Sequence, residues 1–307
     1  MRIHLHWQGL APQDQGASVA MGNFDGVHLG HRAVIDLARR HGPLGILTFE
    51  PHPREFFTPD APPFRLMNAE ARANRLAKLG VQQLYQLPFN ATMAGFTPEA
   101  FAAQVLADGL GVRHVVVGAD FCFGRGRKGT AHDLQTLGNK YGFSTTIADL
   151  IQAEGHEISS TAIRTALSEG RPRDAKTMLG HWHRIDGAVI HGAKRGRELG
   201  YPTANMSVSG LHLPRIGVYA VRVDVLTGPH AGSYDGAASL GVRPMFGENQ
   251  PNLEVYLFDF DGDLYDHHLS VAFIDYLRPE MKFDGLPALV TQMQADCDRA
   301  RKILATL

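Results

Sequence analysis

The sequence predicts an α/β protein in which a parallel sheet is followed by a smaller antiparallel barrel. Up to about residue 180, short apolar strands alternate with helical stretches, as expected for βα units around a parallel sheet. From about residue 183 onward, short β-rich runs punctuated by glycine and proline replace that rhythm, which is typical of an antiparallel barrel. At 307 residues the chain exceeds what one hydrophobic core usually supports. We therefore expect two domains, residues 1–180 and 183–307.

The first half opens with a buried strand, Val19 to Met21, and a helix from about Leu29 to Arg40. Further strands are predicted near residues 44–49, 115–118 and 145–150, and further helices near residues 69–79, 98–108 and 130–141. Ligands of such sheets bind beyond the carboxyl ends of the strands. The segment that follows the first strand is therefore a candidate site.

The second half contains β-rich runs at residues 188–191, 217–225, 237–241, 253–260 and 269–274. A helix is predicted after Asp284, because its apolar positions recur at intervals of three and four. They are Leu286, Leu289, Val290, Met293, Cys297, Ala300 and Leu304. We expect this stripe to pack on the barrel.

Composition excludes several classes of protein. Lysine and arginine number 30 against 31 aspartates and glutamates, which argues against a dedicated nucleic-acid or anionic-membrane binder. The first residues lack an apolar run long enough for a signal peptide, and nowhere in the sequence do about 18 apolar residues run together. The two cysteines lie far apart, so no disulfide framework is expected. We expect a cytoplasmic protein with no nucleic-acid or membrane partner, and nothing in the sequence marks an oligomeric interface.

Two histidines, His28 and His31, follow the first strand across a turn that contains Gly22 and Gly26. A chain that leaves a strand through glycines and enters a helix points backbone N–H groups and the positive helix end at an anion. With Gly30 between them, the two imidazoles can close on a triphosphate and donate hydrogen bonds to its oxygens. Two ordinary loop histidines are the alternative, but the strand, the glycines and the helix all agree with the site. The segment predicts nucleotidyl transfer.

Three hydroxyl residues, Ser159, Ser160 and Thr161, open a later helix, and Arg164 follows one turn in. One hydroxyl is enough to cap a helix, so capping alone is one interpretation. The other is a clamp in which the extra hydroxyls and the arginine hold the β- and γ-phosphates opposite the histidines. The segment by itself does not decide between helix capping and a phosphate clamp.

In the second half, a basic, glycine-punctuated loop leads into Thr203 and Asn205. Residues two apart on a strand face the same way, so both side chains could reach a phosphate-bound Mg²⁺. A hairpin loop followed by an edge strand explains the same residues. Glu254 interrupts an otherwise apolar strand, where a carboxylate is either on the solvated face or a catalytic base.

Taken together, these segments resemble the prokaryotic bifunctional riboflavin kinase/FMN adenylyltransferase family, also called FAD synthetase. The resemblance covers nearly the whole chain. It rests on GNFDGVHLGH (22–31), TFEPHP (48–53), GADFCFG (118–124), ISSTAIR (158–164), GAKRGRELGYPTAN (192–205), SLGVRPMFG (239–247) and LEVYLFDFDGDLY (253–265). The family implies a Rossmann-like H-x-G-H nucleotidyltransferase domain first and a β-barrel kinase domain with a terminal helix second.

The resemblance also implies substrates and roles: riboflavin is phosphorylated to FMN, and FMN is adenylylated to FAD, each with ATP. In the first half, His28, His31 and Arg164 would act on the ATP phosphates. The other ATP-binding positions there would be Gly22, Asn23, Phe24, Gly30, Asp120, Ser159, Ser160 and Thr161.

In the second half, the resemblance makes Thr203 and Asn205 the Mg²⁺ and phosphate ligands and Glu254 the catalytic base. The loop positions Gly192, Lys194 and Gly196 would bind ATP. Riboflavin's hydroxyl is neutral and gains from a base, whereas the FMN phosphate is already charged at pH 7 and needs none. The sequence departs from the family at Met245, where threonine is usual, and at Cys122, where a basic residue is common.

Two other functions fit much of the pattern. One is a chain that keeps a single activity, and the other is a non-catalytic flavin carrier or nucleotide sensor. A carrier has no reason to keep a base and a phosphate clamp that act chiefly in the transition state. The presence of Glu254, His28, His31 and Arg164 therefore favours catalysis.

Overall fold

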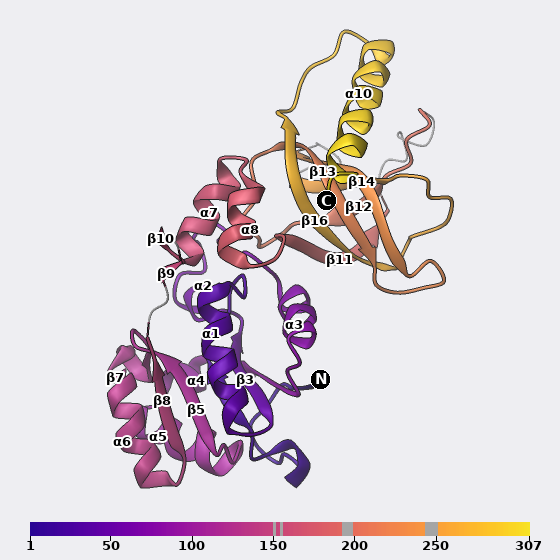
Figure 1. Ribbon diagram of the computed structural model, residues 1–307. Coiled ribbons are helices and arrows are strands. Elements are labelled where there is room, and N and C mark those ends of the chain that lie inside the picture. Colours follow the sequence, from indigo (N-terminus) through magenta and orange to yellow (C-terminus); the bar gives the residue numbers. More distant parts are fainter. Residues whose placement is uncertain (150–151, 154–155, 192–198, 243–250) are drawn as a thin grey trace. The chain divides into compact units, whose positions relative to one another are not determined.

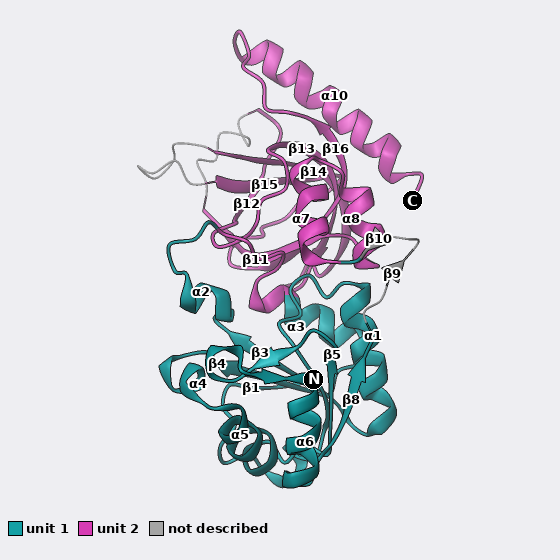
Figure 2. Cartoon of the chain, turned by 90° about the vertical axis from the view of Figure 1, so that its left-hand side faces the viewer, with its two compact units in different colours: residues 1–62, 72–158 teal, residues 63–71, 159–307 magenta. Residues whose placement is uncertain are grey.

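The structure is a computed structural model that describes residues 1–149, 152–153, 156–191, 199–242 and 251–307. The chain forms two compact units (Figure 2). The first consists of Met1–Pro62 and Arg72–Ile158, and the second of Pro63–Ala71 and Ser159–Leu307. The domain division expected from the sequence, at residues 180 to 183, stays a prediction.

A six-stranded parallel sheet forms the centre of the first unit (Figure 1). In sheet order its strands are β1 (Arg2–His4), β4 (Gln83–Pro88), β3 (Leu44–Glu50), β2 (Ser18–Met21), β5 (His114–Gly118) and β8 (Ser144–Ala148). Ser18 of β2 is in register with Leu44 on one side and His114 on the other. The chain moves outward from β2 in one direction and from β5 in the other, so the strand order reverses between them. Ligands of parallel sheets bind at such switch points.

Helices and short turns connect these strands. They are η1 (Pro12–Asp14), α1 (Leu29–Ala38), η2 (Arg39–His41), α2 (Pro53–Phe57), α3 (Ala69–Lys78), α4 (Ala91–Gly95), α5 (Pro98–Ala100), η3 (Phe101–Gly109), η4 (Arg125–Arg127) and α6 (Ala131–Tyr141). Two small antiparallel pairs join β6 (Cys122–Phe123) to β7 (Gly129–Thr130) and β9 (Gln152–Ala153) to β10 (His156–Glu157). Buried side chains of the central strands, such as Val19, Leu47 and Val115, form the core.

The second unit is built on a closed antiparallel barrel, as predicted. In barrel order its strands are β11 (Arg184–Ile190), β12 (Ala204–Ser207), β15 (Pro251–Leu257), β14 (Gly232–Val242), β13 (Gly217–Val225) and β16 (His268–Arg278). Side chains alternate between two faces along each strand. On β15, Leu253 and Val255 point into the barrel core, while Glu254 and Tyr256 point outward.

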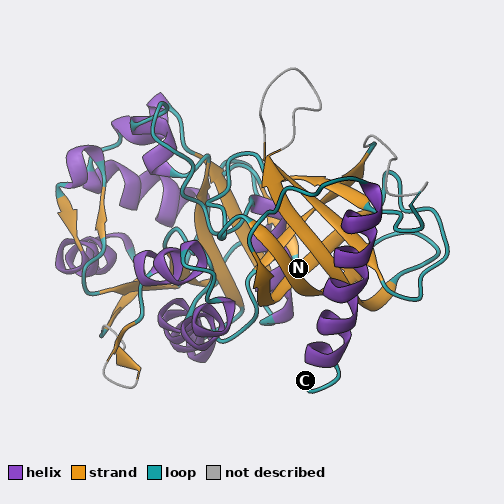
Figure 3. Ribbon diagram, turned by 90° about the horizontal axis from the view of Figure 1, so that it is seen from above, coloured by secondary structure: helices purple, strands orange, loops and turns teal. Residues whose placement is uncertain are grey.

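The described residues of the second unit also form the helices α7 (Ser160–Ser168), α8 (Pro172–Leu179) and α10 (Leu286–Leu304). Figure 3 shows α10 along the outside of the barrel strands. The predicted apolar stripe is confirmed for Cys297, Ala300 and Leu304, which are buried against the barrel. It is wrong at Leu286, which is 61% exposed, because the buried cluster of the barrel meets only the later turns of α10.

The central strands and most of the long helices match the sequence-based prediction, but some elements differ. Strands β1 and β4 were not expected, because β1 has three residues and β4 contains two glutamines among its apolar residues. The helix predicted over residues 98–108 is one short α-helix, α5, followed by the π-helix η3. Among the residues that the structure describes, no helix combines the length and apolar character needed to cross a membrane.

Candidate active sites

The turn between β2 and α1 is held in a strained shape by buried side chains. Phe24, Gly26 and Val27 have φ angles of 53°, 85° and 43°. A positive φ angle costs a non-glycine residue of order 1–3 kcal/mol. It persists only where contacts with the surrounding structure hold the residue in that conformation. Phe24 and Val27 are each 1% exposed, so their burial fixes the turn. The turn is also tied to β3, since the Gly22 N–H donates to the Leu47 carbonyl at 3.1 Å.

The two histidines stack at the start of α1. Their ring centroids are 3.6 Å apart with an interplanar angle of 16°. Nδ1 of His28 accepts a hydrogen bond from the His31 N–H at 3.2 Å, which makes His28 the N-cap of α1. A Cβ at Gly30 would lie 3.2 Å from the His28 ring, so a larger residue would press on the imidazole. The glycine between the histidines is therefore needed for their close packing.

The surroundings of His31 shift its pKa and leave one of its ring nitrogens without a partner among the described residues. Burial, and next the nearby His28, hold the pKa of His31 well below its usual range. Its Nδ1 atom is buried and has no hydrogen-bond partner among the described residues. A buried polar atom without a partner is costly, and a ligand atom that can pair with it removes that cost. An incoming phosphate would also favour the protonated imidazolium, which can donate from both ring nitrogens.

Two other predicted residues lie at the carboxyl ends of neighbouring strands. The backbone carbonyl of Asn23 accepts a hydrogen bond from the Thr48 hydroxyl of β3 at 3.2 Å. Asp120 follows β5, and a Cβ at Gly118 would lie 3.0 Å from its carboxylate oxygen. Asp120 therefore sits beside the switch point between β2 and β5, as an ATP-binding position requires.

The segment predicted to oppose the histidines belongs to the second unit. Ser159 caps α7, because its Oγ accepts a hydrogen bond from the Ala162 N–H at 3.2 Å. The Arg164 Nε donates to the Phe64 carbonyl at 2.6 Å, and its guanidinium lies 5.5 Å from the centre of the Phe64 ring. The capping interpretation is thus confirmed for Ser159. The phosphate clamp formed by Ser160, Thr161 and Arg164 stays a prediction.

An aromatic cluster beyond β3 and β4 was not anticipated. Phe56 and Phe57 of α2 are 37% and 63% exposed. Their rings lie 5.5 and 5.7 Å from Phe89, which directly follows β4. Exposed adjacent aromatics are unusual, and they offer flat apolar surface at the carboxyl edge of the sheet. The paired phenylalanines were visible in the sequence, but only the fold brings Phe89 to them.

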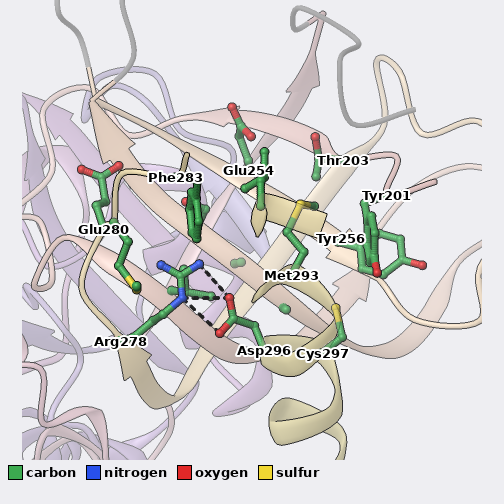
Figure 4. Close-up of a pocket in the computed structure, with 16 residues that line it drawn as sticks. Tyr201, Thr203, Glu254, Tyr256, Arg278, Glu280, Phe283, Met293, Asp296 and Cys297 are labelled. Atoms are coloured by element: carbon green, nitrogen blue, oxygen red, sulfur yellow. Dashed lines mark hydrogen bonds and ion pairs between the residues drawn. The ribbon is translucent and has the colours of Figure 1, made fainter. Parts of the chain in front are cut away.

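In the second unit, a cavity of about 160 Å³ lies between the outer face of the barrel and α10 (Figure 4). We call it the helix-side cavity. Glu254 lines it from β15, opposite Asn205 of β12 and Ser239 of β14. Directly paired residues of neighbouring strands share a face, so these three polar side chains lie on the same outer surface.

The wall across this cavity carries an ion pair that sequence reasoning missed. Arg278, the last residue of β16, donates to the carboxylate of Asp296 on α10 at 2.7 to 3.1 Å. Cys297, the next residue, also lines the cavity, and burial raises the pKa of its thiol to about 11. The sequence did contain one sign of this ion pair, because the carboxylate of Asp296 lies among the apolar positions of the last helix.

A second cavity, of about 460 Å³, lies beside the loop between β15 and β16. We call it the loop-side cavity. Thr203 lines both cavities. The prediction that Thr203 and Asn205 share a strand is corrected, because β12 begins at Ala204 and Thr203 precedes it. The Asn205 amide is fixed by Asn252, whose Nδ2 donates to Asn205 Oδ1 at 3.2 Å.

Comparisons with known proteins cover the whole chain. Residues 10–162 match the family model for FAD synthetase, and residues 179–304 match the model for riboflavin kinase. A bifunctional riboflavin kinase/FMN adenylyltransferase from Pseudomonas fluorescens is 41% identical over 99% of this chain and 98% of its own. The chain belongs to this family. A Bacillus subtilis protein of the same name is 36% identical, with 99% and 98% of the two chains covered.

A solved structure has a fold similar to that of this chain. It is described as a macrolide-efflux protein from Streptococcus pneumoniae, and it is 32% identical with a TM-score of 0.79. The match covers 95% of each chain.

The two family models divide the predicted site residues between the activities. The FAD synthetase match contains the histidine turn, Asp120 and the hydroxyls of α7, whereas Arg164 lies just beyond it. The riboflavin kinase match contains both cavities of the barrel. Gly192, Lys194, Gly196 and Met245 lie outside the described residues.

Proposed function

We propose that the chain performs both reactions of its family: riboflavin phosphorylation at the barrel and FMN adenylylation at the histidine turn. The observation that carries the proposal is the position of Glu254 and Thr203 in the wall of one cavity, with Thr203 shared by a second cavity. A carboxylate in the wall of one cavity, together with a threonine that lines both cavities, suits a base and a phosphate ligand between two substrates.

In the kinase reaction, riboflavin occupies the helix-side cavity. Glu254 accepts the proton of the 5′-hydroxyl while that oxygen attacks the γ-phosphorus of ATP, and ADP leaves. ATP occupies the loop-side cavity, so that its terminal phosphate reaches the flavin at Thr203. The apolar lining contributed by Tyr256 and Met293 suits the flavin ring.

Mg²⁺ belongs to this proposal. The described residues contain no group of three or more histidine, cysteine or carboxylate side chains that could hold a metal, so the ion would depend on the ATP phosphates. The Thr203 hydroxyl and the Asn205 amide oxygen are hard oxygen donors of the kind Mg²⁺ accepts alongside phosphate and water. When bound, the ion would neutralise charge on the transferred phosphoryl group.

In the adenylyltransferase reaction, a phosphate oxygen of FMN attacks the α-phosphorus of ATP, and pyrophosphate leaves. His28 and His31 donate hydrogen bonds to the phosphates, supported by the backbone from Gly22 to Phe24, by Gly30 and by the N-terminus of α1. The unpartnered Nδ1 of His31 supports this role. Asp120, Ser159, Ser160, Thr161 and Arg164 complete the proposed set.

The flavin ring of FMN lies against Phe56 and Phe57. Flat apolar rings stack favourably on exposed aromatics, and this pair stands beyond β3, next to the switch point where ATP would bind. We further propose that Gly192, Lys194 and Gly196 contact ATP in the kinase reaction. A cytoplasmic location is proposed because both cysteines are free thiols.

A chromatographic time course of the purified chain with riboflavin, ATP and Mg²⁺ tests the proposal. We expect FMN to rise first and then to give way to FAD. Accumulation of FMN without FAD would refute the adenylyltransferase half. Conversion of supplied FMN to FAD, with riboflavin left unchanged, would refute the kinase half.

A further inference from the structure

The pair formed by Arg278 and Asp296 is unusual in its geometry and burial. Arg278 Nε lies 3.1 and 2.9 Å from the two carboxylate oxygens of Asp296, and Nη2 lies 2.7 Å from Oδ2. The two side chains are only 15% and 9% exposed. Nε2 of Gln292, one turn earlier on α10, donates to the same carboxylate at 2.9 Å. The carboxylate is therefore held from two elements at once.

The pair connects the end of a barrel strand to the helix that closes the helix-side cavity. Arg278 and Asp296 both line that cavity, and so do Met293 and Cys297 of α10 (Figure 4). A buried ion pair is weak evidence for added stability, because desolvation offsets much of the attraction. Its directional geometry, in contrast, specifies one orientation of the helix. That orientation sets where Met293 and Cys297 stand.

The beginning of α10 has few other constraints among the described residues. Gly285 at the N-cap position has φ 102° and provides no side-chain cap, and Leu286 is 61% exposed. Nearer the middle of the helix, two hydrogen bonds accompany the ion pair: the Tyr201 hydroxyl donates to Gln294 Oε1 at 2.8 Å, and Arg299 Nη1 donates to the Leu277 carbonyl at 2.8 Å. Tyr201 also lines the cavity.

We propose that the Arg278–Asp296 pair is a latch that fixes α10 as the wall of the riboflavin cavity. Arg278 is then a positioning residue for the kinase reaction, acting through Asp296 and the helix. This inference rests on the proposed function, which places riboflavin in that cavity.

The test compares Arg278→Met, Asp296→Leu and the double variant in the full-length protein. Removing one partner leaves the other charge buried and unpaired, so each single variant should raise KM for riboflavin about tenfold with little change in kcat. Replacing both partners with apolar groups restores a packed contact, and KM should return to within about threefold of the parent. FMN adenylylation by the same samples, a reaction of the first unit, should stay unchanged and reports intact folding.

The double variant separates the latch from a direct contact between Arg278 and the substrate. If Arg278 binds riboflavin itself, the double variant will be as impaired as Arg278→Met, and the latch is overturned. An unchanged KM in both single variants overturns it as well. Arg301→Met is the matched control, because Arg301 of α10 forms a bidentate pair with the exposed Asp259, at 2.6 and 2.8 Å, and does not line the cavity. Its KM should equal that of the parent.

Alkylation of Cys297, followed by mass spectrometry, provides a readout independent of turnover. Riboflavin in the helix-side cavity should slow labelling of Cys297 in the parent and leave Cys122 of the first unit unaffected. Protection should weaken in Arg278→Met at equal riboflavin concentration and return in the double variant. Absence of protection in the parent would refute the placement of riboflavin, and hence the proposed function. Protection that is equal in parent and Arg278→Met would refute only the latch.

Discussion

Replacing His183 with phenylalanine should make the barrel more resistant to acid. His183 precedes β11 and is 2% exposed, and its Nε2 is buried with no hydrogen-bond partner among the described residues. Burial, then the nearby His181 and His212, lower the pKa of His183 to about 3, from 6.5 in an exposed histidine. The centre of the His183 ring lies 5.7 Å from that of Phe273, an apolar neighbour that another aromatic ring can contact.

The sign and size of the change in stability follow from the pKa of His183 in the folded protein and that of an exposed histidine. The folded state binds fewer protons at His183 than the unfolded state between pH 6.5 and about 3. The stability contributed by the neutral ring is therefore present above pH 6.5 and lost as pH falls toward 3. Between pH 7 and pH 5 the loss is about 2 kcal/mol in the free energy of unfolding. His183→Phe removes this loss, because phenylalanine has no proton to bind.

Urea unfolding followed by tryptophan fluorescence measures the effect. The chain has two tryptophans, Trp7 in the first unit and Trp182 beside His183 in the second. In a Trp7→Phe background the signal reports the second unit alone. The parent should lose about 2 kcal/mol more than the His183→Phe variant when pH is lowered from 7 to 5. Equal losses in both proteins would show that His183 is not a buried neutral group.

Three further predictions concern activity. Glu254→Gln should lower FMN formation from riboflavin by about 10²- to 10⁴-fold while FMN-to-FAD conversion continues, and equal loss of both rates would contradict separate sites. His31→Ala should make FMN accumulate from riboflavin, and unchanged FAD output would show that His31 does not act on the ATP phosphates. Phe57→Ala should raise KM for FMN about five- to tenfold through lost stacking, measured by adenylylation with FMN supplied; an unchanged KM would remove the ring from the flavin site, and KM for riboflavin serves as the control.

The parts of the fold that depend on local pattern could be predicted from the sequence. Three apolar residues and two glycines predict strand β2 and the turn into α1. The barrel is predicted by the change, near residue 183, from strands that alternate with helices to consecutive short strands. The outward position of Glu254 follows from simple alternation along β15. These features depend on neighbours in sequence, which one chain displays directly.

The parts that depend on distant contacts could not be predicted. Asp296 looks like a solvated charge until β16 brings Arg278 to it, 18 residues earlier in the chain. The segment 63–71 lies within the first half of the sequence yet packs with the second unit, because Leu66 joins the apolar cluster of α7 and α8. Pairing partners across such separations are set by topology, and no local periodicity encodes them.

The strained turn before α1 also has a consequence for the thermodynamics of the ATP binding proposed there. Phe24 and Val27 keep their left-handed backbone because their own side chains are buried in the protein core. The loop is therefore already ordered in the folded protein. The entropy lost in ordering it is part of the free energy of folding and does not reduce the affinity for nucleotide. Glycine at Val27, which is not one of the proposed phosphate-binding positions, would relax the backbone and lose the buried anchor. Nucleotide affinity would then fall even though no group that touches phosphate had changed.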